Sequence, residues 1–154
     1  MSELLKKLNF KEQKEILILN VPKDFEPFLK EIKSAAKVLT ELKAGKEIQF
    51  AIAFVQTQKE VDAFAPKIAK ELINDGLLWM AYPKGTSKKY KSEISRDKGW
   101  TVLGELGFET VRLIAINEDW SCMRFRKAEY VKSITRSEKF TISKEGKEKI
   151  KKKK

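Results

Sequence analysis

The chain of 154 residues contains no histidine and only one cysteine, Cys122. The lack of histidine excludes the Ser–His–Asp triad, the Cys–His pair and the common His-containing zinc and iron sites. A lone cysteine excludes an internal disulfide, and an iron–sulfur cluster or thiolate metal site held by this chain alone. Any catalysis would depend on carboxylates, lysines, tyrosines, serines or a borrowed cofactor. We therefore expect no metal and no resident cofactor. The absence of histidine and the single cysteine also make an enzyme the less favoured class.

Long apolar runs are also missing. No stretch approaches the roughly 18 apolar residues that a membrane span requires. The first ten residues, MSELLKKLNF, lack the apolar core and the small-residue cleavage site of a signal peptide. We expect a cytoplasmic protein without a membrane span, and the length is that of one domain with one core.

Positive charge is abundant but unevenly distributed, with a formal net charge of +11. Residues 126–154 hold twelve basic and four acidic residues, whereas residues 1–125 hold 21 basic and 18 acidic residues. The final KEGKEKIKKKK cannot bury enough apolar surface to offset the entropy of ordering it. We predict a folded domain over residues 1–131 and a basic, largely flexible tail over 132–154, in which KFTIS (139–143) alternates like a short strand.

Aliphatic runs predict the strands of a mostly parallel sheet. Three runs are typical of strands buried on both faces: KEILILNVP (14–22), EIQFAIAFV (47–55) and LLWMAY (77–82). VLTEL (38–42) indicates a short edge strand. FETVRLIAI (108–116) and WSCMRFR (120–126) flank a turn-rich segment and predict an antiparallel hairpin.

Amphipathic stretches between these strands predict three helices, over residues 24–37, 57–73 and 96–106. Thr57 and Glu60 form a capping box for the second helix, and the Asn-Asp-Gly at 74–76 ends it. Ser95 is the expected N-cap of the third. Such strand–helix–strand units are parallel crossovers, so helices should cover both faces of the sheet. The prediction is a three-layer, Rossmann-like α/β domain with a mixed sheet of about six strands and a C-terminal antiparallel pair.

Residues 47–126 resemble the second half of a class I methyltransferase domain. The resemblance is carried by a strand, a long helix, "LINDGLLWMAYP", a helix, "GFETVRLIAI" and a closing antiparallel strand. It implies the fold more than the activity. The first strand departs from that family, because it runs into Asn20, Val21 and Pro22 instead of a glycine-rich turn that would let the cofactor approach the backbone.

Residues 8–126 also resemble a domain-of-unknown-function family of short bacterial proteins. The pattern is an aliphatic strand ending in Asn and Pro, then "W.AYPK" with a nearby Ser and a later "RD", then a strand pair holding "W" and "RF". Here these landmarks are Asn20, Pro22, Trp79, Tyr82, Pro83, Lys84, Ser87, Arg96, Asp97, Trp120, Arg124 and Phe125. The resemblance implies no activity.

Ligands of open α/β sheets collect at the carboxyl ends of the parallel strands. The candidate ligand-binding residues at that edge are Asn20, Pro22, Thr57, Tyr82, Pro83, Lys84, Lys88 and Arg96. Lysines in the loop 84–91 suit a phosphate or a nucleic-acid backbone, and Tyr82 or Tyr90 offers a stacking face. The alternative interpretation of this loop is a flexible, solvated crossover.

Arg124 is the candidate buried charge, because Met123 and Phe125 flank it in a strand that should be internal. Its side chain either extends to solvent or pairs with Glu118 or Asp119, and the pair is the preferred interpretation. The Arg96–Asp97 dipeptide is interpreted as a first-turn helix feature rather than a catalytic pair.

Three functions stay open from the sequence. The preferred hypothesis is a non-catalytic Rossmann-like domain that binds a small anionic ligand or a protein partner. The second is a divergent S-adenosylmethionine-dependent methyltransferase. The third is a nucleic-acid-binding protein that uses the lysines at 84–91 and the basic tail.

Overall fold

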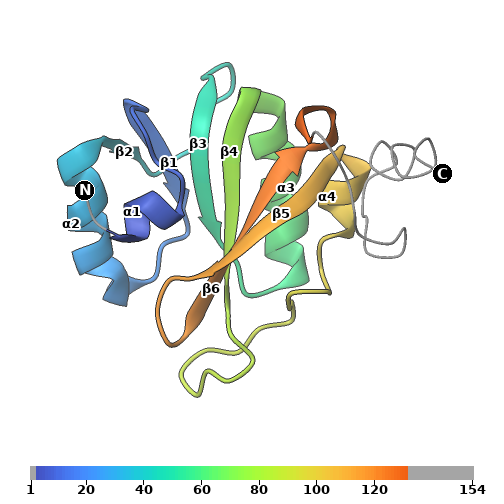
Figure 1. Cartoon of the computed structure of the whole chain (residues 1–154). Coiled ribbons are helices and arrows are strands. Elements are labelled where there is room, and N and C mark those ends of the chain that lie inside the picture. The colour runs from blue at the N-terminus through green and yellow to red at the C-terminus, as the bar shows by residue number, and fades with distance from the viewer. Residues whose placement is uncertain (1–2, 132–154) are drawn as a thin grey trace.

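A computed structural model describes residues 3–131 as a single six-stranded sheet between two layers of helices (Figure 1). Its elements are α1 (Glu3–Lys7), β1 (Glu15–Leu19), η1 (Lys23–Phe25), α2 (Glu26–Ala35), β2 (Lys37–Leu39), β3 (Ile48–Phe54), α3 (Gln58–Glu71), β4 (Leu72–Pro83), α4 (Thr101–Glu105), β5 (Phe108–Ala115), β6 (Trp120–Lys127) and η2 (Ala128–Tyr130). The strand order is β2-β1-β3-β4-β6-β5. The first four strands are parallel, and β6 is antiparallel to both β4 and β5. The predicted fold class is confirmed.

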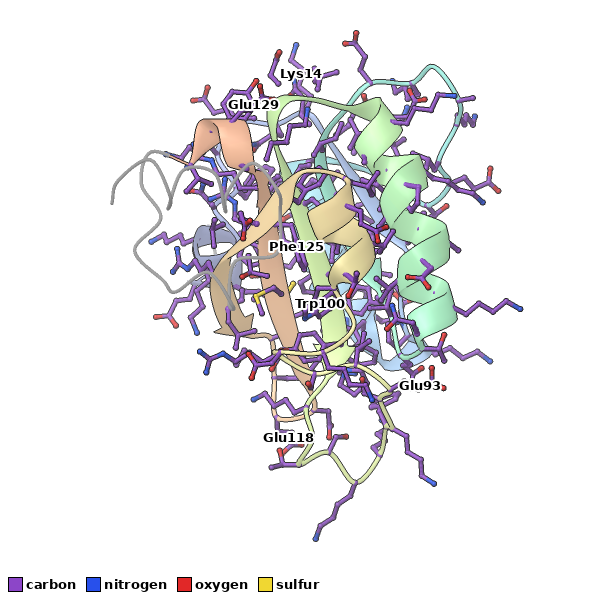
Figure 2. The ribbon with its side chains drawn as sticks, turned by 90° about the vertical axis from the view of Figure 1, so that its right-hand side faces the viewer. Lys14, Glu93, Trp100, Glu118, Phe125 and Glu129 are labelled. Atoms are coloured by element: carbon purple, nitrogen blue, oxygen red, sulfur yellow. The ribbon has the colours of Figure 1, made fainter. Side chains whose placement is uncertain are left out.

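Each face of the sheet has its own apolar core, because side chains alternate between the faces along every strand. The α3-side core includes Val61, Ile68, Met80, Leu103 and Phe125. The α2-side core includes Phe28, Ile32, Phe50, Trp79 and Trp120. Figure 2 shows α3 and α4 together over one face, with Trp100 of the α4 segment beside Phe125 of β6. The expectation that helices cover both faces is confirmed.

The N-terminal helix α1 has no counterpart among the predicted helices. Its Leu5 is buried in the α2-side core together with Leu8. The carbonyl oxygen of Leu8 accepts a hydrogen bond of 3.0 Å from Nε1 of Trp79. This bond satisfies the polar atom of a fully buried tryptophan in the central strand β4.

The second and third helices differ in how well the sequence predicts their ends. The capping box of α3 is present. The Thr57 hydroxyl oxygen accepts a hydrogen bond from the Glu60 backbone N–H, and the Glu60 carboxylate accepts one from the Thr57 backbone N–H. However, α3 ends at Glu71, and the Asn-Asp-Gly at 74–76 lies inside β4 rather than capping the helix. Asn74 has a φ of 49°, and the register between β3 and β4 shifts at Ile48/Phe50, so this tripeptide forms an irregularity in the strand.

The expected helix over residues 96–106 is shorter than predicted. It starts at Thr101, and Ser95 is not its N-cap. Ser95 instead pairs with Lys98 in a tight turn, and its carbonyl oxygen accepts a bond of 2.8 Å from Nε1 of Trp100. Asp97 therefore lies in this turn, and its assignment to a first helical turn is wrong.

Within residues 3–131 no helix combines the length and the apolar character needed to cross a bilayer. The tail predicted for 132–154, with its KFTIS segment, lies outside the described residues.

Candidate ligand-binding site

The turn after β1 is held by Asn20. Its backbone is left-handed, with a φ of 59°, a conformation that suits glycine best and that asparagine tolerates. Its side-chain amide donates to the carbonyl oxygen of Phe54 at 2.9 Å and to Oε2 of Glu60 at 2.6 Å. Strand order reverses at this point, because β1 leads to β2 on one side and β3 leads to β4 on the other. Open α/β sheets bind ligands at such switch points.

A hollow of about 480 Å³ opens beside this turn, and we call it the Asn20 pocket. Its size falls within the range of roughly 300–1,000 Å³ that ligand pockets occupy. The pocket is lined by Asn20, Val21, Pro22, Lys23, Phe54, Gln56, Lys89, Tyr90 and Trp120. These described lining residues include two lysines and no carboxylate, which favours a ligand with negative charge.

Aromatic rings form one wall of the Asn20 pocket. The ring centroids of Tyr90 and Trp120 lie 5.0 Å apart at an interplanar angle of 61°, and Phe54 lies 5.4 Å from Trp120. Nζ of Lys89 lies 5.5 Å from the Tyr90 ring centroid, a cation–π distance. Trp120 is 1% exposed, and its Nε1 has no hydrogen-bond acceptor among residues 3–131. An unpaired buried donor is costly, and an acceptor atom of a ligand would satisfy it.

The basic loop that follows β4 is tied to the sheet edge by hydrogen bonds. Oγ of Ser87 donates to Oδ1 of Asp119 at 2.8 Å and accepts from the Tyr90 backbone at 3.1 Å. The Gln56 side chain donates to the carbonyl oxygen of Lys91 at 3.1 Å. These bonds give the loop a fixed path, which sets Tyr90 against the end of β3.

A second hollow, of about 730 Å³, shares Tyr90 with the first, and we call it the Tyr82 pocket. It is lined by Tyr82, Pro83, Lys84, Gly85, Thr86, Ser87, Tyr90, Lys91, Ser92, Ile94, Ser95, Arg96, Leu113 and Ser121. The pKa of Tyr82 is raised to about 12, chiefly by burial and also by the neighbouring Cys122, while Arg96 and a hydrogen bond with Ser121 act in the opposite direction. Tyr82 is therefore a neutral phenol at ordinary pH and offers a hydrogen bond rather than a base.

Six of the eight predicted ligand-binding residues line one of these two hollows. Asn20 and Pro22 line the Asn20 pocket, and Tyr82, Pro83, Lys84 and Arg96 line the Tyr82 pocket. Thr57 caps α3 and lines neither hollow. Lys88 is exposed on the loop and also lines neither.

Gln56, at the carboxyl end of β3, and Lys89, in the basic loop, line the pocket as the sequence suggested, but sequence reasoning did not single out Trp120 as a pocket residue. For Trp120 a signal was present: it begins the strand antiparallel to β4, so the hairpin brings it opposite Pro83 at the carboxyl edge. Because Trp120 is apolar, sequence reasoning assigned it to the core, where it also lies.

The predicted pairing of Arg124 with Glu118 or Asp119 is wrong. Asp119 lies in the β5–β6 turn and accepts a hydrogen bond from Ser87. Arg124 lies four residues along β6, directly across from Arg112 of β5. The arginine of β6 that finds a carboxylate is Arg126, whose Nε donates to Oδ1 of Asp75 at 2.9 Å. The acidic turn is closer in sequence, but strand extension places even its nearer carboxylate, Asp119, roughly 16 Å along the strand from Arg124.

Metal chemistry has no site among residues 3–131, since no three histidine, cysteine or acidic side chains gather there closely enough to hold an ion.

Comparison with known proteins identifies the fold. No protein-family model matches the chain, and neither does any curated protein. A SAM dependent methyltransferase from Aquifex aeolicus is similar over 81% of this chain and 88% of its own, at 12% identity and a TM-score of 0.54. N-methyltransferase NodS from Bradyrhizobium japonicum WM9, solved with S-adenosyl-l-homocysteine, is similar over 80% and 83%, at 11% identity and a TM-score of 0.52.

The chain has a Rossmann-like, methyltransferase-like fold. A putative type 11 methyltransferase from Sulfolobus solfataricus is similar over 81% of this chain and 89% of its own, at 7% identity and a TM-score of 0.50. The predicted resemblance to class I methyltransferases is thus confirmed for the fold. The turn after β1 keeps its departure from a glycine-rich loop, because the side chains of Val21 and Pro22 line the pocket there.

Proposed function

We propose that the Asn20 pocket binds a small ligand that combines a flat ring with an anionic group. The observation that carries the proposal is the lining itself, which sets Tyr90 and Trp120 beside Lys23 and Lys89 at the switch point of the sheet. Aromatic walls favour a planar ring, and ammonium groups favour a carboxylate or a phosphate. The unpaired Nε1 of Trp120 adds one donor for an acceptor atom of the ligand.

Two kinds of metabolite have this chemistry. Nucleotides join a base to phosphate groups, and the two lysines suit their higher negative charge. S-adenosylmethionine and S-adenosylhomocysteine join an adenine to a single carboxylate. Lys23 and Lys89 in the lining suit the phosphate groups of a nucleotide, which we place first.

A divergent methyltransferase is the second candidate function, and the fold supports it. Similar structures carry the names SAM dependent methyltransferase and N-methyltransferase, and one of them was solved with S-adenosyl-l-homocysteine. The supporting observation in this chain is that its pocket lies at the switch point where Rossmann-like sheets bind nucleoside cofactors. Because Asn20 already adopts a left-handed φ, it takes the place of one glycine of the usual turn.

Calorimetry on the full chain tests the proposal and separates the two candidates. ATP, AMP, S-adenosylmethionine and S-adenosylhomocysteine are titrated under one buffer condition, and thermal shift provides a second readout because a ligand of the folded state raises Tm. At least one ligand should bind with a sub-millimolar Kd. Tighter binding of ATP favours the nucleotide site, and tighter binding of the two S-adenosyl compounds favours the methyltransferase. No binding of any of the four at millimolar concentration contradicts the proposal.

Lysine variants locate the binding site. Lys89→Gln removes a charge from the pocket wall, whereas Lys88→Gln removes the neighbouring charge outside it. We expect Lys89→Gln to weaken ATP binding by about tenfold, since a hydrogen bond to a charged group is worth 1.5–3 kcal/mol. Lys88→Gln should leave the Kd within about twofold, as a screened surface charge does. Equal effects of the two variants would place the ligand elsewhere.

A further inference from the structure

The open face of the β5–β6 hairpin concentrates arginines. On this face the α2-side core takes in β1, β3 and β4 and, near the β5–β6 turn, Ile114, Trp120 and Cys122, with the Phe25 ring of η1 5.9 Å from that of Trp120. Further from the turn, Arg112 is exposed and Arg124 is only partly buried. Arg112 of β5 lies directly across from Arg124 of β6. Arg126 is two residues further along β6, so alternation places it on the same face.

Only one of these three guanidinium groups is neutralised. Arg126 forms an ion pair with Asp75, and its Nε lies 2.9 and 3.1 Å from the two carboxylate oxygens. Neither Arg112 nor Arg124 has an ion pair among the residues that the structure describes. Like charges directly opposite one another on paired strands are destabilising. The Arg112–Arg124 pair therefore holds two positive charges that form no ion pair within the described part of the chain.

Arg124 is the less favourably placed of the two unpaired arginines. It is partly buried, and its Nε is enclosed without a hydrogen-bond acceptor among residues 3–131. Burial lowers the pKa of Arg124, the positive charges of Arg126 and Arg112 lower it further, and Asp75 acts in the opposite direction. A bound anion would reverse the unfavourable contributions of both neighbouring arginines.

We propose that Arg112 and Arg124 form a binding site for a phosphate group, either free or carried by a larger molecule. Paired guanidinium groups present parallel N–H donors to the oxygens of an oxyanion, and a dianionic phosphate matches the charge of two arginines. The site goes beyond the function proposed for the Asn20 pocket. Trp120 marks that pocket on the same strand, roughly 13 Å from Arg124.

The test uses the full chain and inorganic pyrophosphate. A double variant with Lys23→Gln and Lys89→Gln removes the pocket charges, so that any anion bound there does not confuse the result. This variant should still bind pyrophosphate with a sub-millimolar Kd, and phosphate should raise its Tm more than chloride at equal ionic strength. Adding Arg112→Gln or Arg124→Gln should weaken binding about tenfold, because each removes charged hydrogen bonds. Lys30→Gln on α2, which removes one exposed charge elsewhere, is the matched control.

A stability readout separates binding from folding. In the absence of phosphate, Arg124→Gln should have a Tm equal to or above that of the parent, because it removes a desolvated charge facing Arg112. A Tm that falls while pyrophosphate binding is unchanged would overturn the proposal in favour of a structural arginine. So would the absence of any phosphate-specific shift in the parent chain.

A single-stranded RNA oligonucleotide identifies the source of the phosphate. Binding that both arginine variants weaken, and that exceeds pyrophosphate binding, assigns the site to a nucleic-acid backbone. Pyrophosphate binding without such an RNA effect assigns it to a small phosphate ligand.

Discussion

Around Arg112 and Arg124, the two faces of the β5–β6 hairpin carry opposite chemistry although their residues alternate along the same strands. On the α4 side, Phe108 and Phe125 are fully buried, and the Phe125 ring centroid lies 5.1 Å from that of Trp100. On the other side, the exposed Arg112 and the partly buried Arg124 face one another across the strands. Burial of an aromatic ring contributes about 2–3 kcal/mol, whereas opposed arginines oppose folding.

This difference shows which residues of the hairpin serve stability and which are available for binding. The α4-facing residues supply the apolar contacts that hold β5 and β6 to the sheet. On the other face, Trp120 and Cys122 pack in the α2-side core near the turn, whereas Arg112 and Arg124 retain charges that a purely structural strand would not need. Substitutions of Phe108 or Phe125 should therefore change the free energy of unfolding, and those of Arg112 or Arg124 should change binding.

The largest expected effect is at Phe125. Phe125→Ala removes a fully buried ring from the α3-side core and should lower the free energy of unfolding by about 3–5 kcal/mol, through lost burial and the cavity left behind. Urea denaturation followed by tryptophan fluorescence measures it. Arg124→Ala, at the next position and on the other face, is the control and should change stability by less than about 1 kcal/mol. Similar losses for the two variants would remove the contrast between the faces.

Ionisation of Tyr82 probes the same covered side of the sheet. Its pKa is about 12 in the folded chain against 10.0 for an ordinary tyrosine, because the ring is buried. The unfolded state thus loses its proton first, so the stabilisation is complete below pH 10 and is lost as the pH rises toward 12. Relative to Tyr82→Phe, the wild type should lose about 2 kcal/mol between about pH 9 and pH 11.5. Parallel pH profiles for the two chains would show that Tyr82 is accessible to water.

The features that sequence reasoning predicted well are those set by local pattern. The aliphatic runs that became β1, β3 and β4 must be buried on both faces, which requires a parallel sheet between helices. Thr57 and Glu60 specify the start of α3 within four residues, and the structure forms the predicted capping box.

The features that it missed depend on contacts distant in sequence. Ser95 looks like an N-cap, yet its carbonyl is used by the Trp100 indole, so α4 begins later. Arg124 has acidic residues nearby in sequence, but the carboxylate that reaches β6 comes from Asp75 of β4 and pairs with Arg126 instead. The lining of the Asn20 pocket likewise comes from the turn after β1, from β3, from β6 and from the basic loop. These segments are far apart in sequence, so no local pattern predicts that they lie together.

The smallest expected effect distinguishes two arginines on one face of one strand. Arg126→Gln breaks a bidentate pair with Asp75 whose two side chains are each 33% exposed, so solvent screening limits the loss of stability to about 1 kcal/mol. Arg124→Gln, two residues away, should cause no loss, because it has no carboxylate partner among residues 3–131. A double-mutant cycle with Asp75→Asn isolates the pair, and its coupling energy should shrink at about 1 M salt. If Arg124→Gln were the destabilising variant and Arg126→Gln were neutral, the open face would be held by Arg124, and the proposed phosphate site would lose its basis.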